Sequence, residues 1–307
     1  MTNSRPIHKT CHFVHLSPMK QKYKHKVVRD LAWCIESENL LSHSICLPLD
    51  TFEAEALEKH LSELEVDPSP LVSFLASKNT HRLGHYFEAL VYYWLSVSTR
   101  FTILTSNQPL RTSKGITKGE VDVIVKNSGT TKIEHWELAV KFYLALPTEN
   151  EPLFIGPNAN DYLHLKLQKL VEHQCDILKT EEGIQLLADL NIQEATARLF
   201  VKGALYYHPK MTYSNSPAIN PEHNKGWWIY YNEAQKILKE DCQFLLLHKK
   251  DWLSTVSQND NLLSKLDCLE LIETELKESP RSLYLACFKN RELQSTGFVV
   301  HDNWPKL

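Results

Sequence analysis

Apolar residues recur at helical spacing in two stretches of the chain. In residues 27–41, and again in residues 81–97, apolar side chains lie three or four positions apart. Because an α-helix has about 3.6 residues per turn, this spacing gathers them on one face and predicts a helix in each stretch. Thr51 opens a further short helical pattern. We therefore expect a helical flank before residue 80, preceded by a polar, basic leader at residues 1–25.

Short runs rich in β-branched and aromatic residues follow the second helix. The runs at 101–105, 119–125 and 132–144 predict three strands in succession, and 198–207 predicts a fourth. Between the third and the fourth, Asp161 is placed to cap a helix that reaches about Leu178. The order helix, three strands, helix, strand favours an α/β fold with a layered sheet.

The chain beyond Pro209 gives weaker signals. A strand-like run lies at 244–247, an acidic amphipathic stretch at 262–276 and an apolar run at 283–288. This last third either extends the sheet or forms a small subdomain, and the pattern favours neither. We expect a basic leader with a helical flank at 1–80, a core at 81–210 and a mixed C-terminal extension at 211–307.

The composition is that of an ordinary globular protein, with 43% apolar and 23% charged residues. A formal net charge of −3 shows no global basic excess of the kind that phosphate binders usually carry, although a local basic patch is compatible with it. Seven cysteines occur singly without a CxxC pair, which favours reduced thiols over disulfides or a zinc site. No apolar run has the length of a signal peptide or a membrane span, so we expect a cytoplasmic protein without membrane contact.

Two neighbouring predicted strands carry charged side chains. Asp122 lies in the first, and Glu137 and Lys141 share one face of the second, because alternate residues of a strand share a face. If the strands pair as a hairpin, Asp122 and Glu137 converge on a sheet that otherwise buries aliphatic side chains. A Mg²⁺ or Mn²⁺ ion would explain them, since Mg²⁺ binds through one or two carboxylates, water and substrate phosphate oxygens. Such an ion polarises a phosphodiester, and Lys141 would offset the developing negative charge.

This arrangement resembles the PD-(D/E)XK nuclease superfamily. Residues 119–125 read GEVDVIV and residues 135–141 read HWELAVK, and the superfamily places an Asp on one strand and Glu-x-Lys on the next. The resemblance implies a restriction-endonuclease-like core of a helix, a three-strand meander, a helix and a strand. It also implies Asp122 and Glu137 as metal ligands, with Glu88 on the preceding helix as a third acidic ligand.

The chain departs from the superfamily at the lysine. Ala139 occupies the usual lysine position, and Lys141 lies on the same face roughly 7 Å further along the strand. Three possibilities remain: Lys141 leans back on its long stem, a helix lysine such as Lys166 or Lys169 takes its place, or catalysis has been lost. His135 is expected to be structural rather than a ligand.

Several polar and aromatic residues are weaker candidates for substrate contact. Gln174 is placed to touch substrate or a water near the metal, although a polar helix face explains it equally well. Trp227 and Trp228 suit stacking on unpaired bases, but core packing also explains such pairs. A local phosphate-contact patch is the functional interpretation, and a solvated surface the alternative, for Arg111, Lys114, Lys118, Lys166 and Lys169.

Over nearly its whole length the chain is also similar to a bacterial domain-of-unknown-function family, number 1853. That resemblance implies only a nuclease-like fold and adds little about mechanism. The segments that carry it are Val28–Trp33, Arg82–Glu88, His135–Leu144, Gly156–Asn158, Glu172–Gln174 and Gly297–Pro305.

Together these patterns predict a metal-dependent nuclease that hydrolyses phosphodiester bonds of DNA in preference to RNA. Asp122 and Glu137 would hold the ion, Glu88 would assist and Lys141 would stabilise charge. The alternative is a catalytically inactive protein with a nuclease fold that binds nucleic acid or serves as an interaction module. The intact acids favour the first hypothesis, and the displaced lysine favours the second. The absence of a Walker loop, a Rossmann glycine fingerprint and a GxSxG elbow excludes the commonest nucleotide-binding and hydrolase classes.

Overall fold

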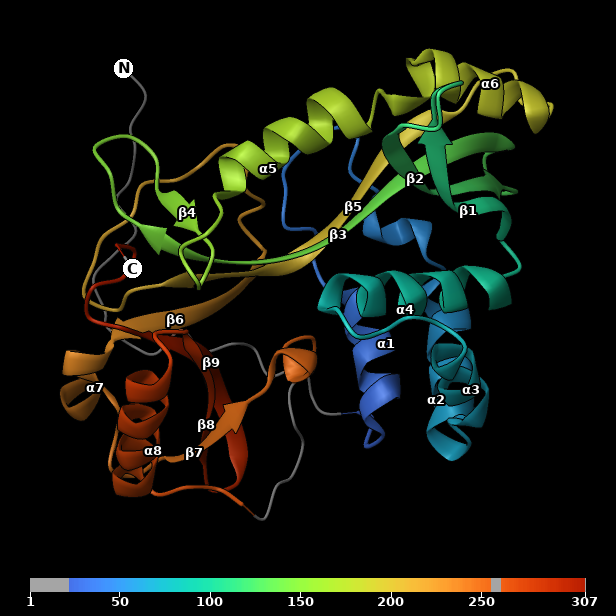
Figure 1. The fold of residues 1–307 in the computed structure, drawn as a ribbon. Coiled ribbons are helices and arrows are strands. Elements are labelled where there is room, and N and C mark those ends of the chain that lie inside the picture. The colour runs from blue at the N-terminus through green and yellow to red at the C-terminus, as the bar shows by residue number, and fades with distance from the viewer. Residues whose placement is uncertain (1–21, 255–260, 307) are drawn as a thin grey trace, which may run out of the picture. The chain divides into compact units, whose positions relative to one another are not determined.

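The computed structural model describes residues 22–254 and 261–306, which form a mixed α/β fold (Figure 1). Within these ranges nine strands form one sheet in the order β1-β2-β3-β5-β6-β9-β8-β7, with β4 paired to β3. The predicted α/β class is therefore confirmed. Most of the predicted basic leader, residues 1–21, lies outside the described ranges. No helix in the described part of the chain has the length and apolar character needed to cross a membrane.

The chain divides into two compact units, each assembled from separate segments. The first, called here the site unit, comprises Asp30–Lys141 and His164–Lys202. The second, called the C-terminal unit, comprises Phe142–Leu163 and Gly203–Leu307 together with the residues before Asp30. Strands β3 (Lys132–Leu146) and β5 (Thr196–Tyr207) begin in the site unit and end in the C-terminal unit.

Helices dominate the chain before residue 80, as predicted. They are α1 (Lys26–Glu36), α2 (Ala54–Val66) and α3 (Ser69–Ala76). The next helix, α4 (Leu83–Val97), matches the predicted helix at 81–97, and its residues 89–95 are all buried. A helix that is apolar nearly all round belongs inside a core, so α4 is a central element of the site unit.

An aromatic layer attaches α4 to the sheet of the site unit. Phe87 of α4 stacks on Phe200 of β5 with ring centroids 5.9 Å apart. Trp136 of β3 stacks on the same Phe200 ring at 6.3 Å, and Phe52 meets Trp136 edge-on at 6.0 Å. Aromatic pairs at these separations add about 0.5–1.5 kcal/mol each beyond the area they bury, so this layer is a main source of stability for the unit.

Strands β1 (Phe101–Arg111) and β2 (Thr117–Asn127) form an antiparallel hairpin, and β2 pairs antiparallel with β3. Strand β1 is longer than the predicted run at 101–105, because it continues through polar residues and Pro109 to Arg111. Such residues are tolerated there because β1 lies at the edge of the sheet, and edge strands accept proline and polar side chains.

The predicted continuous helix at 161–178 is wrong, because the chain there is broken into shorter pieces. An α-helix, α5 (Leu163–Lys169), passes into a π-helical turn at Leu170–Gln174 and then into a 3-10 turn at Ile177–Lys179. A separate helix, α6 (Glu181–Asp189), follows, with the Thr180 hydroxyl accepting from the Gly183 N–H at 3.2 Å as its N-cap.

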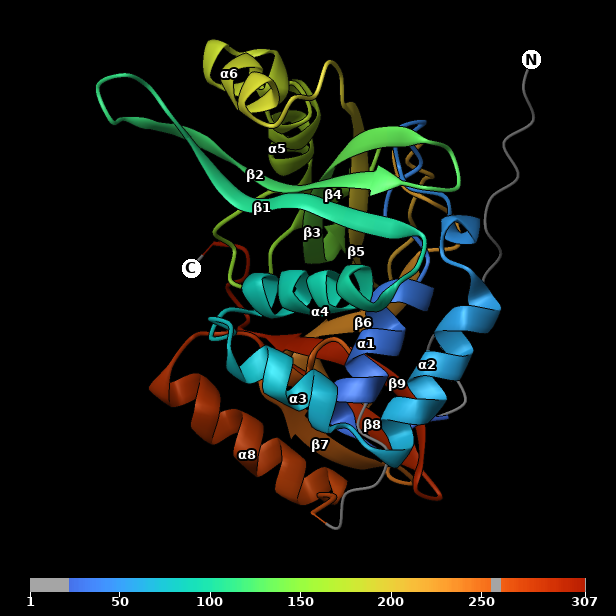
Figure 2. The same ribbon diagram turned by 90° about the vertical axis from the view of Figure 1, so that its right-hand side faces the viewer.

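Helices cover both faces of the sheet in the site unit. Figures 1 and 2 show α4 on one face and α5 and α6 on the other. On the α6 face, Ile177 and Leu178 pack in an aliphatic cluster with Leu110 of β1 and Val121 of β2. A Cβ on Gly119 would lie 2.4 Å from Ile177 Cδ1, so a glycine at this point of β2 lets the 3-10 turn approach closely.

The C-terminal unit adds strands that the sequence pattern left undecided. There β6 (Asn224–Tyr230) pairs parallel with β5, and β9 (Glu292–Val300) pairs parallel with β6. Strands β8 (Leu283–Lys289) and β7 (Gln243–Leu247) continue antiparallel to the far edge. The last third of the chain therefore extends the sheet, and it also belongs to a compact unit separate from the site unit. A three-residue strand, β4 (Leu153–Ile155), was not predicted.

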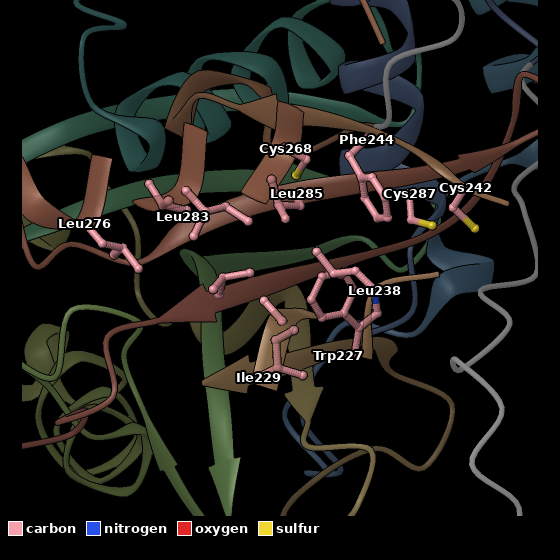
Figure 3. Packing of buried hydrophobic residues seen from close by; sticks show 13 residues of the cluster. Trp227, Ile229, Leu238, Cys242, Phe244, Cys268, Leu276, Leu283, Leu285 and Cys287 are labelled. Atoms are coloured by element: carbon pink, nitrogen blue, oxygen red, sulfur yellow. The ribbon is translucent and has the colours of Figure 1, made fainter. Parts of the chain in front are cut away.

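One face of this unit is covered by two helices over an apolar cluster (Figure 3). The helices are α7 (Tyr231–Ile237) and α8 (Lys265–Glu278), which contribute Ala234 and Ile272 to the cluster. Cys242, Cys268 and Cys287 lie in or beside it, and the six described cysteines are all free thiols, as predicted.

Trp227 and Trp228 are core residues. Trp227 is 1% exposed and its Nε1 donates to Ser295 Oγ at 3.0 Å, while Trp228 is fully buried and its Nε1 donates to the Ala145 carbonyl at 2.9 Å. Rings that are covered on both sides cannot stack on bases. Core packing is therefore the interpretation that the structure supports for this pair.

The parallel pairing of β6 with β9 depends on a glycine. Gly297 lies opposite Trp227, and a Cβ at position 297 would lie 2.1 Å from Trp227 Cδ2 and 2.3 Å from its carbonyl oxygen. We expect Gly297→Ala to lower the free energy of unfolding by about 3 kcal/mol or more, since a backbone atom cannot move aside cheaply. Urea denaturation followed by circular dichroism measures the change.

Gly84→Ala on α4 is the matched control. The nearest atom to a Cβ there is Glu88 Oε1 at 3.9 Å, so the substitution should be neutral or stabilise the helix by about 0.5–1 kcal/mol. Wild-type stability in Gly297→Ala would show that β6 and β9 do not approach this closely.

Candidate functional site

The two predicted metal-binding acids lie where the pairing of β2 with β3 ends. The last described pair in this direction is Val123 with Trp136, so Asp122 and Glu137 occupy the next position on each strand. At this point an Asp122 side-chain oxygen replaces a backbone carbonyl as the acceptor, because Oδ2 accepts from the Leu138 N–H at 2.8 Å. Both acids belong to the site unit.

Glu137 is fully buried, and its two oxygens have different surroundings. Oε2 accepts from Gln174 Nε2 at 2.9 Å. Oε1 lies 2.9 Å from His135 Nε2, but the angles are not those of a hydrogen bond. Within the described residues, Oε1 and both ring nitrogens of His135 therefore lack a hydrogen-bond partner. A buried polar atom in this state costs about 1–3 kcal/mol, so it calls for a ligand, a water or a proton.

Burial also controls the protonation of the pair. Burial and, to a smaller extent, the negative charge of Glu137 together raise the pKa of Asp122 to about 8. Burial likewise raises the pKa of Glu137 to about 8, with the charges of Glu88 and Glu120 acting in the same direction. Without a cation, the pair therefore retains protons at neutral pH, and a nearby divalent ion would favour the ionised forms.

His135 is neutral in this environment, because burial lowers its pKa to about 4. Its contact with Glu137 is thus not an ion pair of opposite charges at neutral pH. The expectation that His135 is structural stays a prediction, and its position beside Glu137 is compatible with support of that side chain.

Glu88 and Lys141 lie within electrostatic reach of each other. The pKa of Glu88, half-buried on α4, is raised by burial and by Glu120, and lowered by His85 and Lys141. Lys141 is also half-buried. The charge of Lys141 thus acts on one acid of the cluster, Glu88.

The two helix lysines behave differently. Lys166 and Lys169 are exposed on α5, and neither is among the charges that shift the pKa of Asp122, Glu137 or Glu88. This favours Lys141 over the helix lysines as the cation of the site.

The π-helical turn brings Gln174 to the site. A π turn contains one residue more than an α turn, which rotates the following side chains relative to the helix and often occurs at functional sites. It ends at Gln174, whose amide binds Glu137. Helical spacing does not reveal such a turn, so from the sequence the contact of Gln174 is only a weak expectation.

Tyr92 is a site residue that sequence reasoning missed. Its hydroxyl lies 2.9 Å from the Asp122 carbonyl oxygen and 3.0 Å from Asn107 Oδ1, which ties α4 to β2 and β1. In the sequence Tyr92 is one of several apolar or aromatic residues on a buried helix, and nothing distinguishes it from core. Glu120, two residues before Asp122 on β2, adds negative charge to the cluster and raises the pKa of Glu137.

A metal ion bound at Asp122 and Glu137 would have few protein ligands. Within residues 22–254 and 261–306 no group of three or more His, Cys, Asp and Glu is arranged to hold a metal ion. The carboxylates of Asp122 and Glu137 are thus a two-acid set, which fits Mg²⁺ better than Zn²⁺, because Mg²⁺ commonly uses one or two carboxylates with water. The role of Glu88 as a further ligand stays a prediction.

The raised pKa values predict that Glu137 destabilises the metal-free fold above neutral pH. The pKa of this acid is higher in the folded state than in the unfolded state, so the folded protein binds more protons. The free energy of unfolding therefore falls as the pH rises from about 4.5 to 8. In EDTA, Glu137→Gln should therefore be more stable than wild type by roughly 1–3 kcal/mol at pH 8, with a smaller difference at pH 5.

Urea denaturation at the two pH values measures this difference. Glu194→Gln, which changes an exposed acid of the same unit, should leave stability nearly unchanged at both. A loss of stability at pH 8 in Glu137→Gln would show instead that the native carboxylate is ionised and well paired.

Comparison with known proteins identifies a family without assigning an activity. No curated protein and no solved structure matches the chain. A family model described as "Domain of unknown function (DUF1853)" matches residues 29–300. Because this match covers most of the 307 residues, the chain belongs to the DUF1853 family.

Proposed function

We propose that this protein is a Mg²⁺- or Mn²⁺-dependent nuclease that hydrolyses phosphodiester bonds of DNA. The observation that carries the proposal is the buried pair Asp122 and Glu137, with raised pKa values and with Glu137 Oε1 lacking a hydrogen-bond partner among the described residues. Such a pair is costly to the fold. A divalent cation offsets that cost and gives the pair a chemical use.

The order of elements supports placing the site unit in the PD-(D/E)XK superfamily. The chain runs α4, β1, β2, β3, α5 and β5, with β4 and α6 as additions, and β1, β2 and β3 form an antiparallel meander. Asp122 and Glu137 lie on the second and third of these strands. This order corresponds to the helix, meander, helix and strand that the sequence resemblance implied.

The residues of the site have separate tasks in this proposal. A bound ion would polarise the phosphate and lower the pKa of its water. The Leu138 N–H orients Asp122, and the Gln174 amide fixes one oxygen of Glu137, which leaves the other oxygen for the ion. Lys141 supplies positive charge near the acids, and this charge lowers the pKa of Glu88. Preorganised charge of this kind is the main contribution that a protein makes to phosphoryl transfer.

A non-catalytic nucleic-acid-binding or interaction module is the second candidate. Two observations favour it: Ala139 occupies the usual lysine position, and the described residues contain no three-ligand cluster. Unlike a nuclease, such a module would bind its partner without a metal ion and without cleaving it.

Metal binding and cleavage test the nuclease directly. Calorimetric titration with Mn²⁺ should show binding to wild type that is lost in both Asp122→Asn and Glu137→Gln, and kept in the control Glu194→Gln. Wild type should cleave at least one member of a panel of single-stranded, double-stranded and branched DNA, and Glu137→Gln should cleave none. A folded, Mn²⁺-saturated wild type without activity on DNA or RNA would favour the binding module.

The displaced lysine gives a second test. Lys141→Met should lower the cleavage rate constant by about 100-fold or more, because it removes charge stabilisation at the transition state, with little change in Mn²⁺ affinity. Lys166→Met and Lys169→Met are matched controls on α5 and should cleave at the wild-type rate. If a control loses activity and Lys141→Met does not, the helix lysine is the functional one.

A further inference from the structure

The β1–β2 hairpin ends in an ordered turn. The Thr112 N–H donates to the Ile116 carbonyl at 2.9 Å, and the Gly115 N–H donates to the Thr112 carbonyl at 2.8 Å. Gly115 has a φ of 79°, in the left-handed region that favours glycine. In Figure 2 the turn end of the hairpin stands clear of α5 and α6. We call residues 106–119 the basic arm.

The basic arm lies in a run without acidic residues. Between Glu88 and Glu120 the chain has 31 residues and no Asp or Glu, whereas the overall frequency of 37 acids in 307 residues corresponds to about four. The same run contains Arg100, Arg111, Lys114 and Lys118. A protein with a net charge of −3 thus carries a local positive stretch, which leads directly into the acidic site at Asp122.

The cations of the arm are available to a partner. Arg111, Lys114 and Lys118 are exposed, and none forms an ion pair with an acid in the described ranges. Lys118 precedes Asp122 by four residues, or roughly 13 Å along the strand. At the turn, Ile116 is 60% exposed, so an apolar side chain lies among the cations.

Two features favour a duplex over a single strand as the partner. A two-stranded β-ribbon fits the major groove of B-DNA, whereas single strands are usually held by aromatic platforms. The basic arm contains no Phe, Trp or Tyr. Its lysines and arginine suit phosphates, and Ile116 suits apolar contact within a groove.

We propose that the basic arm binds double-stranded DNA by its phosphates and positions the duplex at the Asp122–Glu137 site. This inference rests on the proposed function for its substrate class. Its own evidence is the acid-free run and the unpaired, exposed cations. It predicts DNA binding that needs no metal.

Fluorescence anisotropy with a labelled 24-base-pair duplex in EDTA tests the arm. The variant Arg111→Gln/Lys114→Gln/Lys118→Gln should bind on the order of 10- to 100-fold more weakly than wild type, and the slope of log K against log salt should fall by about 2 to 3. Ile116→Ser should weaken binding without changing the slope. Circular dichroism should show unchanged folding, because all four side chains are exposed.

The matched control makes the same charge change elsewhere in the site unit. Lys59→Gln/Lys126→Gln/Lys132→Gln removes three exposed lysines outside the arm and should bind like wild type. Equal affinity and slope in the arm variant and wild type would overturn the proposal, as would an equal loss in the control variant. Tighter binding of a single strand of the same length would overturn the duplex assignment.

Failure of the arm and failure of the nuclease give different results. If Mn²⁺ binds through Asp122 and Glu137 but the arm variant binds duplex normally, the proposed role of the arm is wrong and the metal site is supported. If the arm variant loses duplex binding while wild type neither binds Mn²⁺ nor cleaves DNA, the role of the arm is supported and the nuclease proposal is wrong.

Discussion

The hydrogen bond from the Leu138 N–H to Asp122 Oδ2 is the contact on which the candidate site depends. A side-chain oxygen accepts from the neighbouring strand just beyond the last described backbone pair of β2 and β3. The bond fixes the position of one carboxylate relative to β3 and therefore relative to Glu137, the residue before Leu138. The bond therefore helps to set the separation of the two buried carboxyl groups.

The rest of the site unit supports this unfavourable pair. On one face of the sheet the aromatic layer of Phe87, Trp136 and Phe200 holds α4, and on the other an aliphatic cluster holds the turn at Ile177–Lys179 and α6. Burial of one large apolar side chain contributes about 1.5–3 kcal/mol, so a few such contacts offset two destabilising acids. Polar groups that a fold must stabilise from elsewhere are typical of functional sites.

Local patterns in the sequence predicted what short-range geometry determines. Strand alternation and a short turn set the register that places Asp122 next to Glu137, and helical spacing predicted α4 closely. The π-helical turn before Cys175 was missed because it does not alter the polar and apolar pattern. Parallel pairing of β5, β6 and β9 was missed because partners lie far apart in sequence, with Trp227 opposite Gly297. The contact of Gln174 with Glu137 depends on the π turn and on a strand 37 residues away.

For Lys141, the structure adds information that the sequence motif does not contain. A lysine at position 139 would lie two residues after Glu137, whereas Lys141 lies roughly 7 Å further along β3. A lysine side chain has a flexible four-carbon stem, so its charge acts well away from its Cα. Glu88 on α4 responds to that charge and also to Glu120. The helix acid therefore provides an electrostatic link between the acidic cluster and a lysine placed beyond the motif. The charge of Lys141 therefore reaches the helix acid despite its position two residues beyond Ala139.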